Sequence, residues 1–237
     1  MKRLAILLGM LGFFAGCEVD TAPPQAQSPA PRQAEGEARN FIPHWGYYVD
    51  PDHDCKVRLK KENLRLNVPG TAHDLADELG LMNAPRVLQA VDGDFTVEVK
   101  VRGTFAPTAP NIPGRFAYTG AGIVVMKDEH TYVGFQRAAC RRDGITYYYA
   151  NFELRQNHSI AAFDEQMFAD SSDVILRVER RDDVIYGAVS QDGNSWHEMK
   201  PISVALPSHV MVGVVAVNSS DEKFIAQFEG YKLSPGE

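Results

Sequence analysis

One strand-like segment, residues 145–155, carries ring, amide, carboxylate and guanidinium groups at alternate positions. Alternate residues of an extended strand point to the same face of a sheet. The side chains sharing that face would be Tyr147, Tyr149, Asn151, Glu153 and Arg155, and an earlier segment with the same alternation adds Tyr132 and Gln136. Rings can cover the apolar C–H faces of a sugar, while planar polar groups pair with its hydroxyls. The pattern predicts a carbohydrate-binding face, and its structural alternative is a polar outer sheet held by cross-strand pairs.

Two polar loops are expected to add His73 and Arg86 at the rim of this face. The planar fork of Arg86 could hold a carboxylate or sugar hydroxyls, or could join a loop to an acidic turn. His73 could titrate near neutral pH. Its neighbour Asp74 is suited to cap a short helix over residues 74–79 that Gly80 would close.

A candidate metal site lies upstream, where Asp50, Asp52 and Asp54 alternate with other residues. Oxygen ligands at this spacing resemble the start of a calcium-binding loop. The glycine and glutamate that an EF-hand requires are replaced here by Cys55 and Lys61, so that motif is excluded. A calcium site of another kind and a solvated acidic turn both remain open.

The signs of catalysis are weak. Retaining glycosidases need two carboxyl groups about 5–5.5 Å apart, and Glu153 is the one acid that the polar face supplies. The sequence has no nucleophile elbow, phosphate-binding loop or His-Glu-x-x-His motif. We therefore expect a non-catalytic binding module. One alternative is a glycan-active hydrolase that uses Glu153, and the other is a protein-interaction module with an exposed apolar patch.

The N-terminus has the pattern of an export signal. Residues 1–16 combine Lys2 and Arg3 with an apolar run too short to span a bilayer. They lead to Phe-Ala-Gly-Cys, which resembles a bacterial lipobox with Cys17 as the lipidated residue, and a plain secretion signal is the alternative. Residues 17–40 are rich in Pro, Ala and Gln and predict a disordered tether. We expect a lipid-anchored or secreted protein of the cell envelope that meets the membrane only through this anchor.

The charge balance and the cysteine content limit the partners and the metal sites that are expected. The 237 residues carry 24 basic and 31 acidic side chains, a formal charge of −7. Removing Lys2 and Arg3 with the signal leaves 22 against 31, or −9. A nucleic-acid partner is therefore not expected. Apart from Cys17 there are two cysteines, Cys55 and Cys140, which could pair in an exported protein but are too few for a zinc site by themselves.

Residues 41–237 are expected to form one all-β domain that positions these groups. Residues 95–101 alternate Phe and Val with polar residues, which is typical of a half-buried strand. Further strands are expected at residues 64–68, 122–126, 131–137, 145–154, 174–179, 184–190, 210–217 and 224–233. Tight-turn residues separate them at 92–94, 142–144, 181–183 and 192–194. The face opposite the polar one, with Tyr148, Ala150, Phe152 and Leu154, should join the core.

A series of short motifs, taken in order, resembles a known family. The motifs are Trp45-Gly46, Asp50-Pro51-Asp52, Val68-Pro69-Gly70, His73-Asp74-Leu75, Asn83-Ala84-Pro85-Arg86, Asp92-Gly93-Asp94-Phe95, Ala121-Gly122-Ile123, Tyr132-Val133, Ser190-x-Asp192-Gly193-x-x-Trp196 and Val212-Gly213-x-x-Ala216. Their order is similar to that in a bacterial domain family of unknown function related to fungal "regulation of enolase" proteins, in the concanavalin A-like lectin/glucanase superfamily. The resemblance implies a two-sheet antiparallel jelly-roll sandwich with little helix and one concave face. It implies no activity, because that superfamily contains lectins, glucanases and interaction modules.

Overall fold

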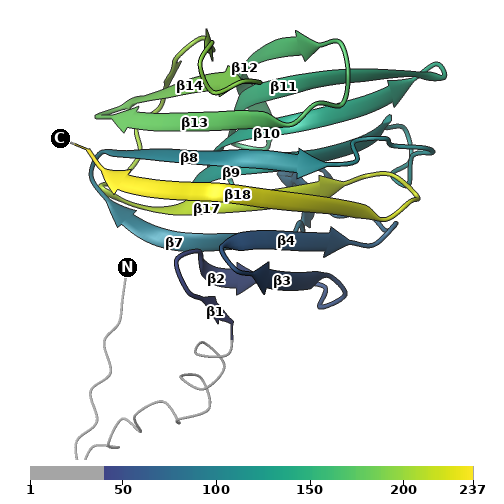
Figure 1. Ribbon diagram of the computed structural model, residues 1–237, viewed down its shortest axis with the longest axis horizontal. Helices are drawn as coiled ribbons and strands as arrows, with labels where there is room; N and C mark the ends of the chain where they lie inside the picture. Colours follow the sequence, from purple (N-terminus) through teal and green to yellow (C-terminus); the bar gives the residue numbers. More distant parts are fainter. Residues whose placement is uncertain (1–39, 237) are drawn as a thin grey trace, which may run out of the picture.

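The computed structural model describes residues 40–236, which form two large antiparallel sheets (Figure 1). In spatial order, sheet A contains β1 (Phe41–Ile42), β2 (Gly46–Val49), β7 (Arg86–Asp92), β17 (His209–Asn218), β9 (Ala117–Asp128), β10 (Thr131–Arg142), β11 (Ile145–Gln156) and β12 (Ser159–Phe168). Sheet B contains β15 (His197–Glu198), β14 (Val184–Ser190), β13 (Val174–Arg181), β8 (Phe95–Gly103), β18 (Phe224–Pro235), β4 (Asn63–Val68) and β3 (Lys56–Lys60), and β16 (Ile202–Ser203) also pairs with β14. The predicted two-sheet sandwich is therefore confirmed.

The sheets pack face to face because each strand presents apolar side chains at alternate positions. On β8, Phe95, Val97, Val99 and Val101 are fully buried, while the residues between them are partly exposed or exposed. From sheet A, the rings of Phe135 and Phe152 enter the same core and meet edge to face with centroids 5.1 Å apart. The alternation read from the sequence therefore gives the correct inner face of these strands.

The hairpin turns follow the predicted residues. Between β10 and β11, Asp143 and Gly144 both have positive φ, at 51° and 79°. Two such residues match the twist of the flanking strands in a two-residue hairpin. Of the longer strands, β7 and β12 were not predicted. The strand β12 pairs only with β11 at the edge of sheet A, and it leaves Ile160, Phe163 and Met167 exposed, so its apolar residues do not alternate cleanly.

The helix expected over residues 74–79 is wrong. Leu75–Ala76 forms the short strand β5, which pairs with β6 (Leu81–Met82), and only the 3₁₀ helix η1 (Asp77–Leu79) lies between them. Asp74 does not cap this helix, since its Oδ1 atom accepts the N–H of Leu75 at 2.8 Å. Gly80 does end it in the left-handed conformation, with φ of 68°. The backbone at Leu75 is extended rather than helical, and Leu75 is buried against sheet A.

The segment from Leu75 to Met82, called here the covering segment, lies over part of the outer face of sheet A. It helps to build a second apolar cluster on that face, separate from the core between the sheets. The buried members of the cluster are Leu75, Ala84, Leu88, Val124, Met126, Tyr132, Val215 and Val217. One part of the outer face is thereby closed, and the uncovered part carries polar side chains with the exposed rings of Tyr147 and Phe163 and the exposed Met167 among them.

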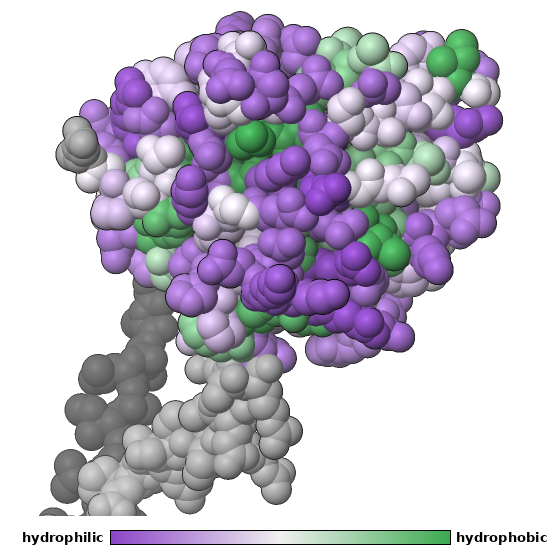
Figure 2. Space-filling model, viewed as in Figure 1, coloured by the Kyte–Doolittle hydropathy of each residue, from purple (hydrophilic) through white to green (hydrophobic). Residues whose placement is uncertain are grey.

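The face of the molecule shown in Figure 2 is largely hydrophilic, with small apolar areas between polar side chains. Ion pairs link the outer face of sheet B. Arg102 lies 2.8 Å from Asp173 and 2.9 Å from Glu229. No helix within residues 40–236 is both long and apolar enough to cross a membrane. The predicted signal, the Cys17 anchor and the tether up to residue 39 lie outside the described residues.

Candidate functional site

The uncovered part of the outer face of sheet A forms a pocket of about 210 Å³. Its floor comes from β9, β10 and β11. The strand register places Gln136 beside Asn151 and Gly134 beside Glu153. Because Gly134 has no side chain, the space between Gln136 and Glu153 stays open. Asp74 and Leu75 form one wall, and Arg115 and Phe116 form another.

Two amide side chains are held side by side in the floor. The Tyr118 hydroxyl lies 3.1 Å from Gln136 Oε1 and 3.3 Å from Asn151 Oδ1. The single proton of the Tyr118 hydroxyl can serve only one of these oxygens, so the other amide turns its NH₂ group to the phenol oxygen. Neither amide side chain has another hydrogen-bond partner within the part of the chain that the structure describes. The residues Gln136 and Asn151 are only 4% and 5% exposed. The pocket floor therefore presents an amide N–H donor beside an amide oxygen acceptor.

Gly120 makes room for this arrangement. A Cβ atom at this position would collide with Gln136 Oε1 and lie 2.5 Å from Tyr118 Oη. A glycine in the middle of a strand is otherwise unfavourable. Its role here is to let the two side chains meet over the backbone of β9.

A chain of charged groups runs along one side of the pocket. Arg155 lies 3.0 Å from Glu153 Oε1 and makes two contacts, of 2.7 and 2.8 Å, with Glu78 of the covering segment. Arg115 reaches the same Glu78 at 2.8 Å. Burial disfavours the charge on Arg155, but the carboxylates of Glu153 and Glu78 raise its pKa overall. The second oxygen of Glu153 has no protein donor among residues 40–236 and remains available as an acceptor.

A second carboxyl group, Asp74, lines the same pocket. Burial raises the pKa of Asp74 to about 6, and Glu153 acts in the same direction, while the Leu75 N–H and Arg155 oppose them. The pocket thus holds one carboxylate that is paired with an arginine and one carboxyl group that titrates in mild acid.

Aromatic rings complete the walls. Tyr149 lines the pocket, and burial raises the pKa of its phenol, so its hydroxyl stays protonated at neutral pH. Phe116 and Phe163 are half exposed at the rim. Neither residue was predicted to belong to the site. Phe163 lies on β12, which was not predicted, and is the register partner of Glu153 on β11. A prediction of β12 would have placed the ring of Phe163 beside the polar face.

Four of the predicted sugar-binding residues, Gln136, Tyr149, Asn151 and Glu153, meet in this pocket. The others do not line it. Tyr147 shares their strand face but is 41% exposed outside the pocket. Tyr132 lies beneath the covering segment, where it is buried and donates its hydroxyl to the carbonyl of Leu75.

The expected placement of His73 and Arg86 at the rim is corrected by the structure. Arg86 is buried and donates to the carbonyls of Met82 and Ala84, both at 3.1 Å, while Glu129 lies 3.5 Å away. His73 is fully buried, with Nδ1 3.0 Å from the carbonyl of Thr71. Both side chains anchor the backbone near the covering segment, because a buried polar side chain needs partners wherever the chain supplies them.

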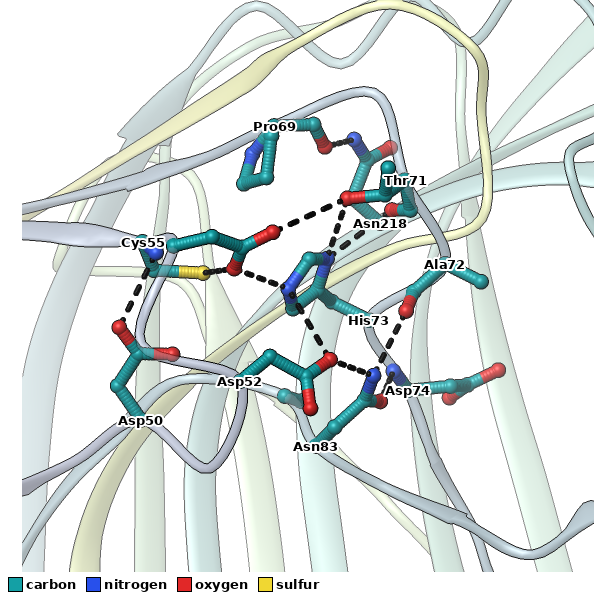
Figure 3. A network of polar contacts seen from close by, with 12 residues as sticks. Asp50, Asp52, Cys55, Pro69, Thr71, Ala72, His73, Asp74, Asn83 and Asn218 are labelled. Atoms are coloured by element: carbon teal, nitrogen blue, oxygen red, sulfur yellow. Dashed lines mark hydrogen bonds and ion pairs between the residues drawn. The ribbon is translucent and has the colours of Figure 1, made fainter.

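His73 also connects to the acidic loop that was predicted to bind calcium (Figure 3). Its Nε2 atom lies 2.8 Å from Asp54 Oδ1 and 3.8 Å from Asp52 Oδ2. Asp52 accepts the amide N–H of Asn83 at 2.6 Å. Asp50 accepts the Cys55 N–H at 3.0 Å, and its other oxygen is buried without a partner in the described residues.

These contacts bear on the calcium hypothesis. Protein donors occupy Asp50, Asp52 and Asp54 separately, so a cation bound by all three would have to displace them. The orphaned oxygen of Asp50 is the feature of the loop that a cation would satisfy. Calcium binding here stays a prediction. Cys55 and Cys140 are both free, so the structure contains no bridge between them.

Comparison with known proteins places the chain in a family. A family model described as "Protein of unknown function (DUF1349)" matches residues 74–236. The chain belongs to this family. The matched DUF1349 region contains every residue that lines the pocket, whereas the acidic loop and His73 precede it. No curated protein matches the sequence.

Solved structures share the fold at low sequence identity. A functionally unknown protein from Saccharomyces cerevisiae is 17% identical, with a TM-score of 0.63, over 81% of this chain and 97% of that one. Lectin I-B4 from Griffonia simplicifolia, in its metal-free form, is 12% identical, with a TM-score of 0.53, over 77% of this chain and 92% of the lectin. A xylan beta-1,4-xylosidase from Bacillus halodurans is 15% identical, with a TM-score of 0.56, over 78% of this chain but only 35% of the enzyme. These likenesses confirm the predicted concanavalin A-like sandwich, and they concern the fold alone.

Proposed function

We propose that this protein is a carbohydrate-binding module of the bacterial cell envelope and that the pocket on sheet A is its sugar site. The observation that carries the proposal is the pair of amide side chains of Gln136 and Asn151, which one tyrosine hydroxyl holds side by side and which have no other hydrogen-bond partner in the described chain. Fixed amide groups that line a pocket and have spare hydrogen-bonding capacity are available to the hydroxyls of a ligand.

The rest of the pocket suits the same ligand class. A sugar hydroxyl both donates and accepts, so it can bridge an amide N–H and the unpaired oxygen of Glu153. The rings of Tyr149 and Phe163 supply apolar surface beside these groups. The volume of about 210 Å³ is below that of sites for drug-sized ligands, which favours one sugar unit or a chain end.

A glycan array followed by polysaccharide pull-down tests the proposal. Binding to at least one plant, algal or bacterial glycan is expected, with loss of binding in Asn151→Ala and Tyr149→Ala. Tyr147→Ala is the matched control, because Tyr147 lies on the same strand face but outside the pocket. The proposal fails if no glycan binds, or if Tyr147→Ala reduces binding as much as Tyr149→Ala does.

The proposed location depends on the N-terminus. The lipobox-like residues before Cys17 support attachment by a diacylglycerol-modified cysteine, with residues 17–40 as the spacer. Mass spectrometry of the protein from a bacterial membrane fraction should find the lipid adduct on Cys17. An unmodified mature chain in the culture medium would favour plain secretion instead.

One observation favours a second function, hydrolysis of a glycosidic bond. Asp74 and Glu153 come from different segments and line one pocket, and the pKa of Asp74, at about 6, suits a general acid. The paired carboxylate of Glu153 would then stabilise or attack the sugar carbon. Release of reducing ends from a bound glycan, abolished in Asp74→Asn, is the expected sign. Binding without any release would leave the module non-catalytic.

A further inference from the structure

Three side chains outside the pocket converge at one end of sheet A. His130 lies in the two-residue turn between β9 and β10, and His158 lies in the turn between β11 and β12. The register of Thr131 with Gln156 brings these turns to the same end of the sheet. Asp77, at the start of η1, reaches them from the covering segment.

The potential ligand atoms of the three residues point at one another. Asp77 Oδ2 lies 2.7 Å from Nδ1 of His130 and 2.7 Å from Nδ1 of His158. All three atoms lie within 4.8 Å of one another. The two imidazole rings stand with centroids 5.1 Å apart at an angle of 59°, so both present the same nitrogen to the carboxylate without stacking on each other.

Each residue is held in place by separate contacts. The N–H of Asn157 donates to the carbonyl of His130 at 3.2 Å and joins the two turns. The two contacts of 2.7 and 2.8 Å between Glu78 and Arg155 tie η1 to β11. His158 has φ of 61°, a left-handed conformation that favours glycine or asparagine in such a turn.

We propose that Asp77, His130 and His158 bind a divalent transition-metal ion, with Zn²⁺ the best fit. Imidazole nitrogen with one carboxylate oxygen is a donor set that suits Zn²⁺ and its neighbours rather than Ca²⁺ or Mg²⁺. Ligand atoms about 2.0–2.1 Å from a tetrahedral zinc stand roughly 3.3 Å apart, so Oδ2 and each Nδ1 must separate by about 0.6 Å. The histidine side chains are 60% and 63% exposed and are free to make this adjustment.

Such an ion would act as a clip between the covering segment and the two hairpin turns. The covering segment forms one wall of the pocket, and Glu78, the residue after Asp77, contacts both arginines of that pocket. Three protein ligands leave a coordination position for water. The site is distinct from the acidic loop at Asp50–Asp54, which would take an oxygen-seeking cation.

Isothermal titration of the purified full chain with ZnCl₂ tests the proposal, with CaCl₂ titrated in parallel. One Zn²⁺ per chain is expected, and its affinity should fall at least about 100-fold in the His130→Ala/His158→Ala double variant. His197→Ala is the matched control, because His197 is an exposed histidine outside the cluster, and this variant should bind zinc like the wild type. Melting of wild type and double variant without metal checks that the exposed substitutions leave the fold intact.

Three outcomes would overturn the proposal. The first is the absence of zinc binding, and the second is unchanged zinc affinity in the double variant. The third is loss of zinc binding in Cys55→Ser but not in the double variant, which would place the ion at the cluster of Asp54, Cys55 and His73. A zinc-dependent rise in melting temperature that the double variant lacks would support the clip directly.

Discussion

Replacing Tyr118 by phenylalanine should weaken sugar binding more than it weakens the fold. The substitution keeps the ring and removes only the hydroxyl that contacts Gln136 Oε1 and Asn151 Oδ1. A net loss of about 1 kcal/mol of unfolding free energy is expected for one buried hydrogen bond. For a domain of this size that corresponds to a fall of roughly 2–4 °C in melting temperature.

The loss of binding should be larger, because the two amides are no longer positioned in the absence of ligand. Ordering a mobile side chain on binding costs about 0.5–1.5 kcal/mol, so two such side chains cost about 1–3 kcal/mol. The dissociation constant should therefore rise about 5- to 150-fold. Calorimetric titration with the glycan that the array identifies measures this change, and thermal melting measures the stability.

Tyr231→Phe is the matched control for stability. Its hydroxyl accepts the amide N–H of Gln89 at 2.9 Å, away from the pocket lining. This variant should lose a similar amount of stability and keep the wild-type dissociation constant. The reasoning is refuted if Tyr118→Phe binds as tightly as the wild type, or if the two variants weaken binding equally.

Three further variants test other parts of the structure. Gly120→Ala should weaken glycan binding at least about 10-fold with little change in melting temperature, since its Cβ meets the ends of Tyr118 and Gln136, and equal losses of binding and stability would contradict this. For Asp74, whose pKa is raised from 3.8 to about 6, protonation favours the folded state. The stabilisation by protonated Asp74 is therefore present below pH 4 and lost as the pH rises through 6. In melts at several pH values, the free energy of unfolding of the wild type should fall relative to that of Asp74→Asn by on the order of 1–3 kcal/mol between pH 4 and 7. A stability difference that does not change with pH would argue against the burial of this carboxyl group. Arg137→Met should cost about 3–5 kcal/mol in urea unfolding, because the fully buried guanidinium donates to the carbonyls of Asp170, Ser172 and Tyr149, and a cost below 1 kcal/mol would mean that water replaces it.

The sequence predicted the strands and their faces well where the alternation is strict. On β11, Ala150, Phe152 and Leu154 are buried in the core, and Tyr149, Asn151 and Glu153 share the opposite face. Local chemistry suffices for this, because neighbouring side chains of a strand must point to opposite sides. The missed strand β12 has exposed apolar residues at the sheet edge, where the one-sided contact with β11 relaxes the pattern.

The exposure of a residue was predicted less well where it depends on contacts with a segment distant in the sequence. Tyr132 and Tyr149 both belong to the outer face of sheet A, but Tyr132 is covered and Tyr149 lines the pocket. The difference comes from the covering segment, which lies far from β10 and β11 in the sequence. For the same reason Asp74 joined the pocket unexpectedly, and His73 was assigned to a rim that it does not reach.

By itself, the sequence determined the all-β class, the polar face of β11 and the side chains available to a sugar, because these depend on a two-residue period and on side-chain type. The two-sheet sandwich was implied by the resemblance of the ordered motifs to a known family. The tertiary structure decided which part of that face stays open, which carboxyl groups share the pocket, and which histidines meet an aspartate at the end of the sheet. Those properties depend on contacts between segments tens of residues apart, and chain order alone does not specify such distances.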